Sequence, residues 1–335
     1  MKKPVLIFFV ALSLLIFSES YSQSRGQHLN KTQVDDIDNF TNVGNIGLTV
    51  TNFGIFGHGY NNPDRPSCLY KLHSSNPREQ VEHLSYGGLW IGGKGGFFGG
   101  THVSSAIIDG VFDYGDQGFE FTTSAADSDT IITRSSIITS RWFDPSAISH
   151  QDFICNFTDK NTRVPGTEIE IPNHIPLGLD VHMESYAWNY AYADAFVILN
   201  YTIRNVSPNP IEDIYAALWV DASIGNMNYT SIYEPGGGWS WYDNLNGYDA
   251  EHKLAYQYDA DGDDGFSESY LGIRFLGASV PTANYNVYYN QWQWSTSSSG
   301  DFPDYVMPVD DEGRYKTMST THPYRSPPAQ GGIPD

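Results

Sequence analysis

An acidic run in the second half of the chain carries the residues whose types and spacing best fit a chemical task. Asp259, Asp261 and Asp263 alternate along a glycine-containing segment, and Asp264 follows directly. Carboxylate oxygens are hard ligands that suit Ca²⁺, and alternate positions of a tight loop can converge on one ion. The spacing departs from an EF-hand loop, because position 6 is Asp264 and position 12 is Tyr270. Two interpretations stand: a Ca²⁺ site built from the four aspartates, or an acidic turn without an ion.

Aromatic residues are dense in the same half of the chain. They are Tyr186, Trp188, Tyr190, Tyr192, Trp239, Trp241, Tyr242, Trp292 and Trp294. Rings exposed on a sheet face could stack on sugars, so the five tryptophans are the candidates for carbohydrate binding. The same rings could fill a core or an interface, which is the commoner fate of large aromatic side chains.

Sequence patterns that would indicate catalysis are weaker than those that indicate binding. The chain has no His-Glu-x-x-His run and no Gly-x-Ser-x-Gly elbow, and its ten histidines are scattered. A hydrolase that acts on polysaccharide would need two carboxylates roughly 5 to 10 Å apart across a cleft. Candidates for such a pair are Asp180, Glu184, Asp221 and Glu251. In a chain this acidic, chance pairs are expected, so the sequence favours a protein that binds without catalysis.

The only two cysteines are Cys68 and Cys155. Export to an oxidising compartment would allow one disulfide between them. Pairing requires a close approach of the two backbones, which the spacing along the sequence does not reveal. The sequence therefore leaves both states open, a disulfide and two free thiols.

Three segments around residue 200 must supply the scaffold for these side chains. Apolar residues alternate with polar ones from Leu179 to Ala187 and from Ile214 to Ala222, while Ala195–Ile203 is apolar on nearly both faces. Period-two alternation is typical of half-buried strands. We expect three consecutive antiparallel strands, with core positions at Leu179, Val181, Met183, Ile214, Leu218 and Val220.

Composition extends this expectation to the whole chain. Glycine (32), tyrosine (23) and phenylalanine (18) are abundant, which favours strands and turns over helices. We predict an all-β protein, an antiparallel β-sandwich of one large or two packed domains. The proline-rich stretch Arg163–Pro176 suggests a boundary, which divides the chain into residues 23–165, residues 166–294 and a polar segment at residues 295–335.

The N-terminus has the three parts of a secretory signal peptide. Lys2 and Lys3 precede the apolar run Val5–Phe17, and Ser20 and Ser22 occupy the small-residue positions of a cleavage site. The apolar run is shorter than the ~18 to 20 residues that cross a bilayer. We expect residues 1–22 to be removed, no transmembrane segment thereafter, and a secreted or cell-surface protein.

The net charge of the chain limits the classes of molecule that are expected to bind it. The chain carries a formal net charge of −21, and a surface this acidic repels phosphate backbones and anionic lipid. Nucleic acid is therefore excluded as an expected partner. A polysaccharide or another surface protein remains, as does an affinity for divalent cations such as Ca²⁺.

Several runs resemble a family of large secreted bacterial proteins known as cargo of type IX secretion, with a C-terminal sorting domain. They are Asn42–Leu48, Arg65–Cys68, Val81–Leu84, Gly88–Gly93 and Val197–Asn205. The resemblance covers most of residues 40–335 and implies a cell-surface or released β-sandwich protein. It also implies several hundred further residues with an immunoglobulin-like region, so the chain looks truncated at Asp335. The matching motifs are structural, and the resemblance assigns no catalytic residue.

Overall fold

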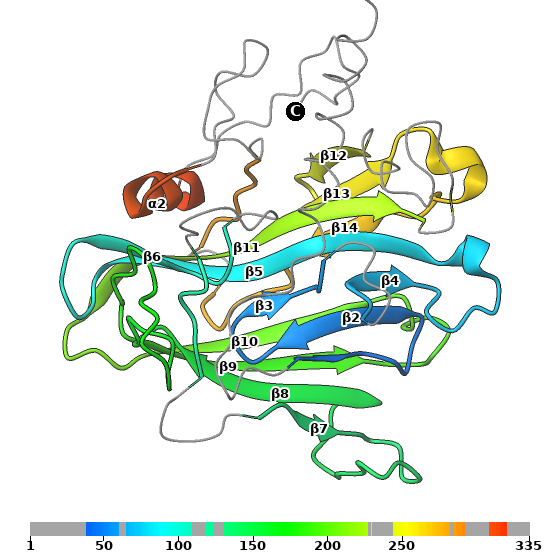
Figure 1. The fold of residues 1–335 in the computed structure, drawn as a ribbon, viewed down its shortest axis with the longest axis horizontal. Coiled ribbons are helices and arrows are strands. Elements are labelled where there is room, and N and C mark those ends of the chain that lie inside the picture. The colour runs from blue at the N-terminus through cyan, green and yellow to red at the C-terminus, as the bar shows by residue number, and fades with distance from the viewer. Residues whose placement is uncertain are drawn as a thin grey trace, which may run out of the picture.

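The computed structural model describes residues 38–59, 65–108, 118–123, 130–226, 229, 244–281, 285–291 and 308–319. Within these residues the chain forms two large antiparallel sheets packed face to face, a smaller third sheet and one α-helix (Figure 1). The predicted all-β sandwich is confirmed. Across the described ranges, no helix combines the length and the apolar character that a membrane span requires.

The first sheet is organised around one long strand, β5 (Val81–Gly95). The strand β11 (Ile211–Gly225) pairs along one side of β5, while β4 (Cys68–Tyr70), β3 (Ile55–Phe56) and β6 (Thr101–Ser105) pair in turn along the other. Outside these lie β2 (Ile46–Thr51) and β1 (Asp38–Phe40).

The glycines of β5 are structural. A side chain at Gly87 would collide with the ring of Phe56, and one at Gly88 would collide with Ile107. Only glycine permits backbone and neighbouring side chains to approach this closely in a strand that is buried on both faces.

The second sheet has the order β10-β9-β8-β7, with every pair antiparallel. Its strands are β7 (Ile132–Arg134), β8 (Gln151–Thr158), β9 (Leu179–Ala187) and β10 (Val197–Asn205). The predicted pairing of the segments that became β9 and β10 is confirmed. Leu179, Val181 and Met183 are at most 3% exposed, as the alternation predicted.

The prediction that β11 continues this sheet is wrong. The turn after Asn205 carries the chain across to the first sheet, where the long edge of β5 provides a partner for almost all of β11. Local alternation cannot identify such a long-range partner, because it fixes a strand's face and not its neighbour.

The predicted burial of β11 is also wrong for Ile214 and Leu218, which remain 56% and 37% exposed. Leu218 lies opposite the buried Leu89 and therefore points to the core side of the sheet. However, β11 stands at the end of the strand order, on the side of β5 away from β2 and β3 (Figure 1). The second sheet does not fully cover it there. Val220 is partly buried against the core.

The core between the two sheets draws on both halves of the chain. It includes Val50 and Leu89 from the first sheet, and Phe153, Phe157 and Val181 from the second. Because β5 pairs with β11 and β8 pairs with β9, the expected division near residue 165 runs through a single sandwich.

The two cysteines are free and buried within that core. Cys68 lies on β4 in the first sheet, whereas Cys155 lies on β8 in the second and its Sγ donates to the Thr51 carbonyl oxygen at 3.5 Å. The disulfide that the sequence left open is therefore not formed in this structure. Both thiols instead pack as small apolar side chains.

The third sheet consists of β12 (Asn244–Asp249), β13 (Leu254–Asp259) and β14 (Leu271–Arg274). It adjoins the end of β11, where the side chain of Asn244 bonds both backbone groups of Ile224. The end of β13 leads directly into the acidic run, whose last residues lie in the short turn η2 (Gly262–Gly265), with non-helical backbone angles at Asp263 and Asp264.

Candidate functional site

The outer face of the second sheet carries mostly polar side chains, with Ile132, Ile154 and Ile198 among them. The register places Asn156, His182 and Thr202 in one row across β8, β9 and β10, and it places Glu184 beside Asn200 in the next. Neighbouring strands lie ~4.8 Å apart, and alternate residues of one strand lie ~7 Å apart. The polar side chains therefore lie at regular spacings on this face, and Ile132 and Ile154 complete the row of Glu184 and Asn200.

Glu184 is the centre of this array. Its Oε2 accepts hydrogen bonds from the Tyr186 hydroxyl at 2.8 Å and from Asn200 Nδ2 at 3.1 Å. Its Oε1 lies 3.6 Å from the Arg134 guanidinium and 3.8 Å from His182 Nε2. Burial, together with the neighbouring Glu184 carboxylate, raises the pKa of Tyr186 to about 12. The phenol therefore stays protonated and continues to donate.

The charges on this face balance locally. Arg134 pairs with Glu184, Lys160 pairs with Asp180 at 2.9 Å, and Arg204 lies opposite Asp180 in the register. In a chain of net charge −21, a face with compensated charges and many amide and hydroxyl groups suits a neutral, hydroxyl-rich ligand. An anion or a cation would gain little from it.

Aromatic rings border the face at the connection between β9 and β10. Trp188 is partly buried, with ring centroids 6.4 Å from Tyr186 and 5.9 Å from Phe196. Tyr190 and Tyr192 stack on each other at 5.4 Å and are 47% and 83% exposed. Trp188 is thus both a packing residue and a neighbour of the polar face. Trp239, Trp241, Trp292 and Trp294 lie outside the described residues.

The acidic loop brings together three of its four predicted ligands. One carboxylate oxygen each from Asp259, Asp261 and Asp263 lies within 4.8 Å of the others. Asp259 and Asp263 are only 6% and 4% exposed, while Asp264 lies on the surface beside the group. Three hard oxygen donors at this separation match the ligand chemistry of Ca²⁺.

Internal hydrogen bonds shape the loop. The backbone N–H of Gly262 donates to Asp259 at 2.6 Å, that of Asp263 donates to Asp261 at 2.9 Å, and the Ser267 hydroxyl donates to Asp263 at 2.8 Å. Asp263 and Asp264 both adopt the left-handed region, with φ of 49° and 55°. Two consecutive non-glycine residues in this region carry backbone strain.

The loop is anchored to the end of β11 and to the 3-10 helix η1 (Pro77–Glu79). Asn226 Nδ2 donates to the Arg78 carbonyl oxygen at 2.9 Å, and the Arg78 guanidinium lies 4.1 Å from the centroid of the Phe266 ring. Burial, followed by the negative charge of the four aspartates, raises the pKa of Tyr229. The loop is therefore a fixed centre of negative potential at the junction of two sheets.

The carboxylates considered for hydrolysis are dispersed. Asp180 and Glu184 share a face of β9 but are four residues apart, which is ~13 Å along a strand and exceeds the separation that glycoside hydrolysis uses. Asp221 lies on β11, in the other sheet. Glu251 is exposed in the turn between β12 and β13.

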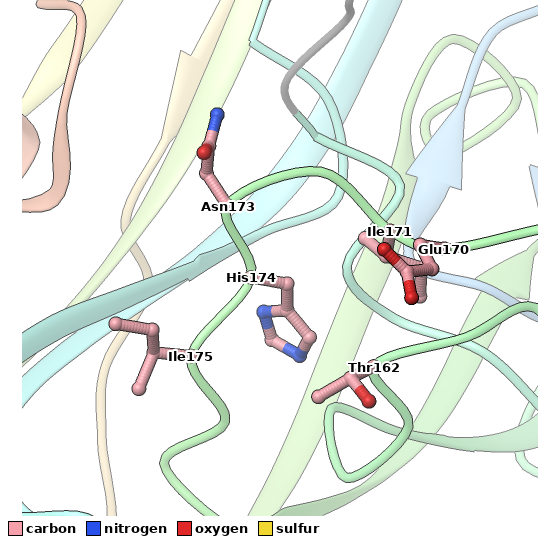
Figure 2. Close-up of a pocket in the computed structure, with 6 residues that line it drawn as sticks. All are labelled: Thr162, Glu170, Ile171, Asn173, His174 and Ile175. Carbon is pink, nitrogen blue, oxygen red and sulfur yellow. The ribbon is translucent and has the colours of Figure 1, made fainter.

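A pocket of about 470 Å³ opens beside the loop that precedes β9. Figure 2 shows its six lining residues, with the His174 imidazole turned toward Thr162 and the Glu170 carboxylate set apart beside Ile171. The side chain of His174 is fully buried and that of Glu170 is 74% exposed. These two groups face different environments and do not form an acid and base poised on one ligand.

Sequence analysis named Glu184 as a candidate carboxylate but missed Arg134, Asn156 and Asn200. Each of the missed residues is unremarkable in its local sequence. Their common feature is the register of four strands, which brings residues 134, 156, 184 and 200 onto one face. Only the strand order reveals that relationship.

Comparison with known proteins found no match among protein-family models, curated proteins or solved structures. The functional argument therefore depends on the geometry of the chain itself.

Proposed function

We propose that this chain is a secreted, non-enzymatic protein of the cell surface that binds a neutral polysaccharide. The ligand lies on the outer face of the sheet β10-β9-β8-β7, and Ca²⁺ in the acidic loop stabilises the fold. The observation that carries the proposal is the set of hydrogen-bonding side chains around Glu184, with its balanced charges and its border of aromatic rings.

The chemistry of the face supports this class of ligand. Sugar hydroxyls both donate and accept hydrogen bonds, and the amides of Asn156 and Asn200 can do the same at once. A polysaccharide can contact successive rows of the sheet, while the face of a ring such as Tyr192 offers a surface for a sugar's C–H groups. The absence of a close carboxylate pair among the four candidates favours binding over hydrolysis.

We include export in the proposal, with Gln23 as the mature N-terminus, because residues 1–22 have the sequence pattern of a secretory signal peptide. Type IX secretion is the route that the family resemblance implies. N-terminal sequencing of the exported protein tests the cleavage, because retention of residues 1–22 would contradict the proposed location.

Affinity electrophoresis tests the binding function. The protein is run through gels that contain neutral polysaccharides, such as a β-glucan, a xylan or a mannan, and through gels with an anionic polysaccharide. We expect retardation by at least one neutral polymer and weaker retardation by the anionic one, because the protein is itself strongly acidic. Release of reducing ends from the bound polymer would instead establish a hydrolase.

Two variants sharpen the test. Asn156→Ala and Asn200→Ala remove amides from neighbouring rows of the face, and each should weaken retardation by about two- to tenfold, since one lost hydrogen bond costs about 0.5–1.5 kcal/mol. Asn286→Ala is the matched control, because Asn286 is an exposed asparagine of the segment 285–291 that bonds Tyr288. Equal retardation of all three variants would locate binding elsewhere.

A further inference from the structure

The segment 135–149 lies between β7 and β8 and forms a loop at the margin of the second sheet, beyond β7 (Figure 1). Its two ends are held together, because the Ser136 backbone N–H donates to the Ser149 carbonyl oxygen at 2.9 Å. At the start of β8, the Asp152 carboxylate accepts from the backbone N–H groups of Ile148 and Ser149, each at 2.8 Å. The loop is therefore closed and fastened at its base.

Hydrogen bonds within the loop fix its backbone further. The Ser135 N–H donates to the Trp142 carbonyl oxygen at 2.9 Å, and the Asp144 N–H donates to the Ser135 carbonyl oxygen at 2.9 Å. The Asp144 carboxylate accepts from the backbone N–H of Ser146 at 2.8 Å and from its hydroxyl at 2.6 Å. A loop that is already held in one shape loses little conformational entropy when it binds a partner.

This rigid loop presents four large apolar side chains to solvent. Their exposed fractions are 80% for Ile138, 47% for Trp142, 46% for Phe143 and 57% for Ile148. The Arg141 guanidinium lies 4.7 Å from the centroid of the Trp142 ring, so the ring and the cation are presented together. Tryptophan and arginine are among the residues that most often dominate the energy of a protein interface. The loop therefore has the composition and the rigidity of a contact surface.

On the first sheet, comparable apolar groups are covered by the chain itself. The helix α2 (Asp311–Ser319) lies on the outer face of that sheet, across β5, β6 and β11 (Figure 1). Its Tyr315 and Met318 pack with Trp90 and Val103, which are 2% and 1% exposed. The apolar side chains of the loop 135–149 have no equivalent cover within the described part of the chain, since all four remain exposed.

The charge of the loop distinguishes it from the rest of the surface. Arg141 and Asp144 are its only charged residues, so the loop is neutral in a chain whose formal net charge is −21. Two copies of so acidic a chain repel over most of their surfaces. A neutral apolar loop lets two copies meet without this repulsion, and the exposed cation of Arg141 complements the carboxylates of a second copy. An anionic lipid surface, by contrast, would be repelled by the rest of the chain.

We propose that the loop 135–149 is a self-association surface, to which a second copy of this chain binds through the four apolar side chains and Arg141. The pairing is symmetric, so the loop of one copy packs against the loop of the other about a two-fold axis. One loop is a small contact compared with the ~800 Å² per partner of a standard interface. The association is therefore weak, with a dissociation constant on the order of 100 µM.

Sedimentation equilibrium of the exported chain tests the proposal. It is measured from about 5 to 500 µM protein in about 0.3 M salt, which screens the repulsion between acidic copies. We expect a monomer at the lowest concentration and a growing fraction of dimer as the concentration rises. A monomer at every concentration overturns the proposal. A monomer that sediments with phosphatidylcholine vesicles also overturns it, because the loop would then bind a lipid surface.

Matched variants locate the contact. Trp142→Ser and Ile148→Ser each remove apolar surface twice in a symmetric dimer, so each should weaken dimerisation by about tenfold or more. Ile169→Ser is the control, because Ile169 is 55% exposed, close to the 57% of Ile148, but lies in the segment before β9. It should dimerise as the wild type does, and the urea midpoint of each variant verifies its fold. Unchanged dimerisation in the two loop variants, or an equal loss in Ile169→Ser, overturns the proposal.

Discussion

The exposure of β11 at the edge of the sandwich can be tested by one pair of substitutions, Val181→Asp and Leu218→Asp. Both residues were predicted from alternation to face the core, yet Val181 is 1% exposed and Leu218 is 37% exposed. Val181 lies on β9 between the two sheets, whereas Leu218 lies on β11 at the end of the first sheet. The same new carboxylate therefore enters two different environments.

The expected costs differ severalfold. At position 181 the change removes the burial of a valine side chain, worth about 1.5–3 kcal/mol, and adds an unsatisfied polar group that costs about 1–3 kcal/mol more. The free energy of unfolding should fall by roughly 3–6 kcal/mol. At position 218 the carboxylate can reach water, and the loss should be about 1–2 kcal/mol, chiefly from lost apolar contact.

Urea denaturation followed by tryptophan fluorescence measures both values, provided that the m-value is unchanged. A loss at Leu218 equal to that at Val181 would mean that β11 is covered as fully as the core strands. A loss below about 1 kcal/mol at Val181 would contradict the position of the core itself.

Three further outcomes follow from the same structure. Excess Ca²⁺ should raise the melting temperature relative to a chelator, because an ion that binds only the folded state stabilises it. This shift in melting temperature should disappear in Asp261→Ala. A shift that persists in the variant would place the ion elsewhere. Burial raises the pKa of Glu82 to about 7. The contribution of Glu82 to the free energy of unfolding is therefore complete below the ordinary pKa of a glutamate, and about 3 kcal/mol in total is lost as the pH rises through 7. Glu82→Gln should flatten that decline in urea titrations, and an unchanged decline would assign it to other groups. Thiol titration should find both cysteines unreactive in the native protein, because each is buried. After unfolding it should find two free thiols. A count of zero after unfolding would show a disulfide.

The part of the fold that could be predicted was the part that depends on the local alternation of apolar and polar residues. Alternation from Leu179 to Ala187 correctly gave a strand, its buried face and its hairpin partner. The same reasoning failed for Ile214 and Leu218, because the partner of β11 is β5, more than a hundred residues earlier. Burial at an edge depends on how far the opposite sheet extends, and no short window of sequence contains that information.

The candidate sites likewise divide into one that local sequence predicts and others that depend on long-range packing. Asp259, Asp261 and Asp263 are neighbours in sequence, so their convergence was foreseeable from loop spacing alone. The array around Glu184 combines residues from four strands. The contact between Glu120 and His174 joins two separate loops. Neither arrangement has a sequence signature, because both arise from strand order and packing.

Isothermal titration of the neutral polysaccharide that retards the protein most strongly tests the central claim most directly. The titration compares the wild-type chain with Asn156→Ala, Asn200→Ala and the control Asn286→Ala, each verified as folded by its urea midpoint. We predict saturable binding to the wild type and to Asn286→Ala, with affinity reduced by about two- to tenfold in the two variants of the second sheet. Equal affinity in all four proteins, or no saturable binding by the wild type, would contradict a polysaccharide site on this face.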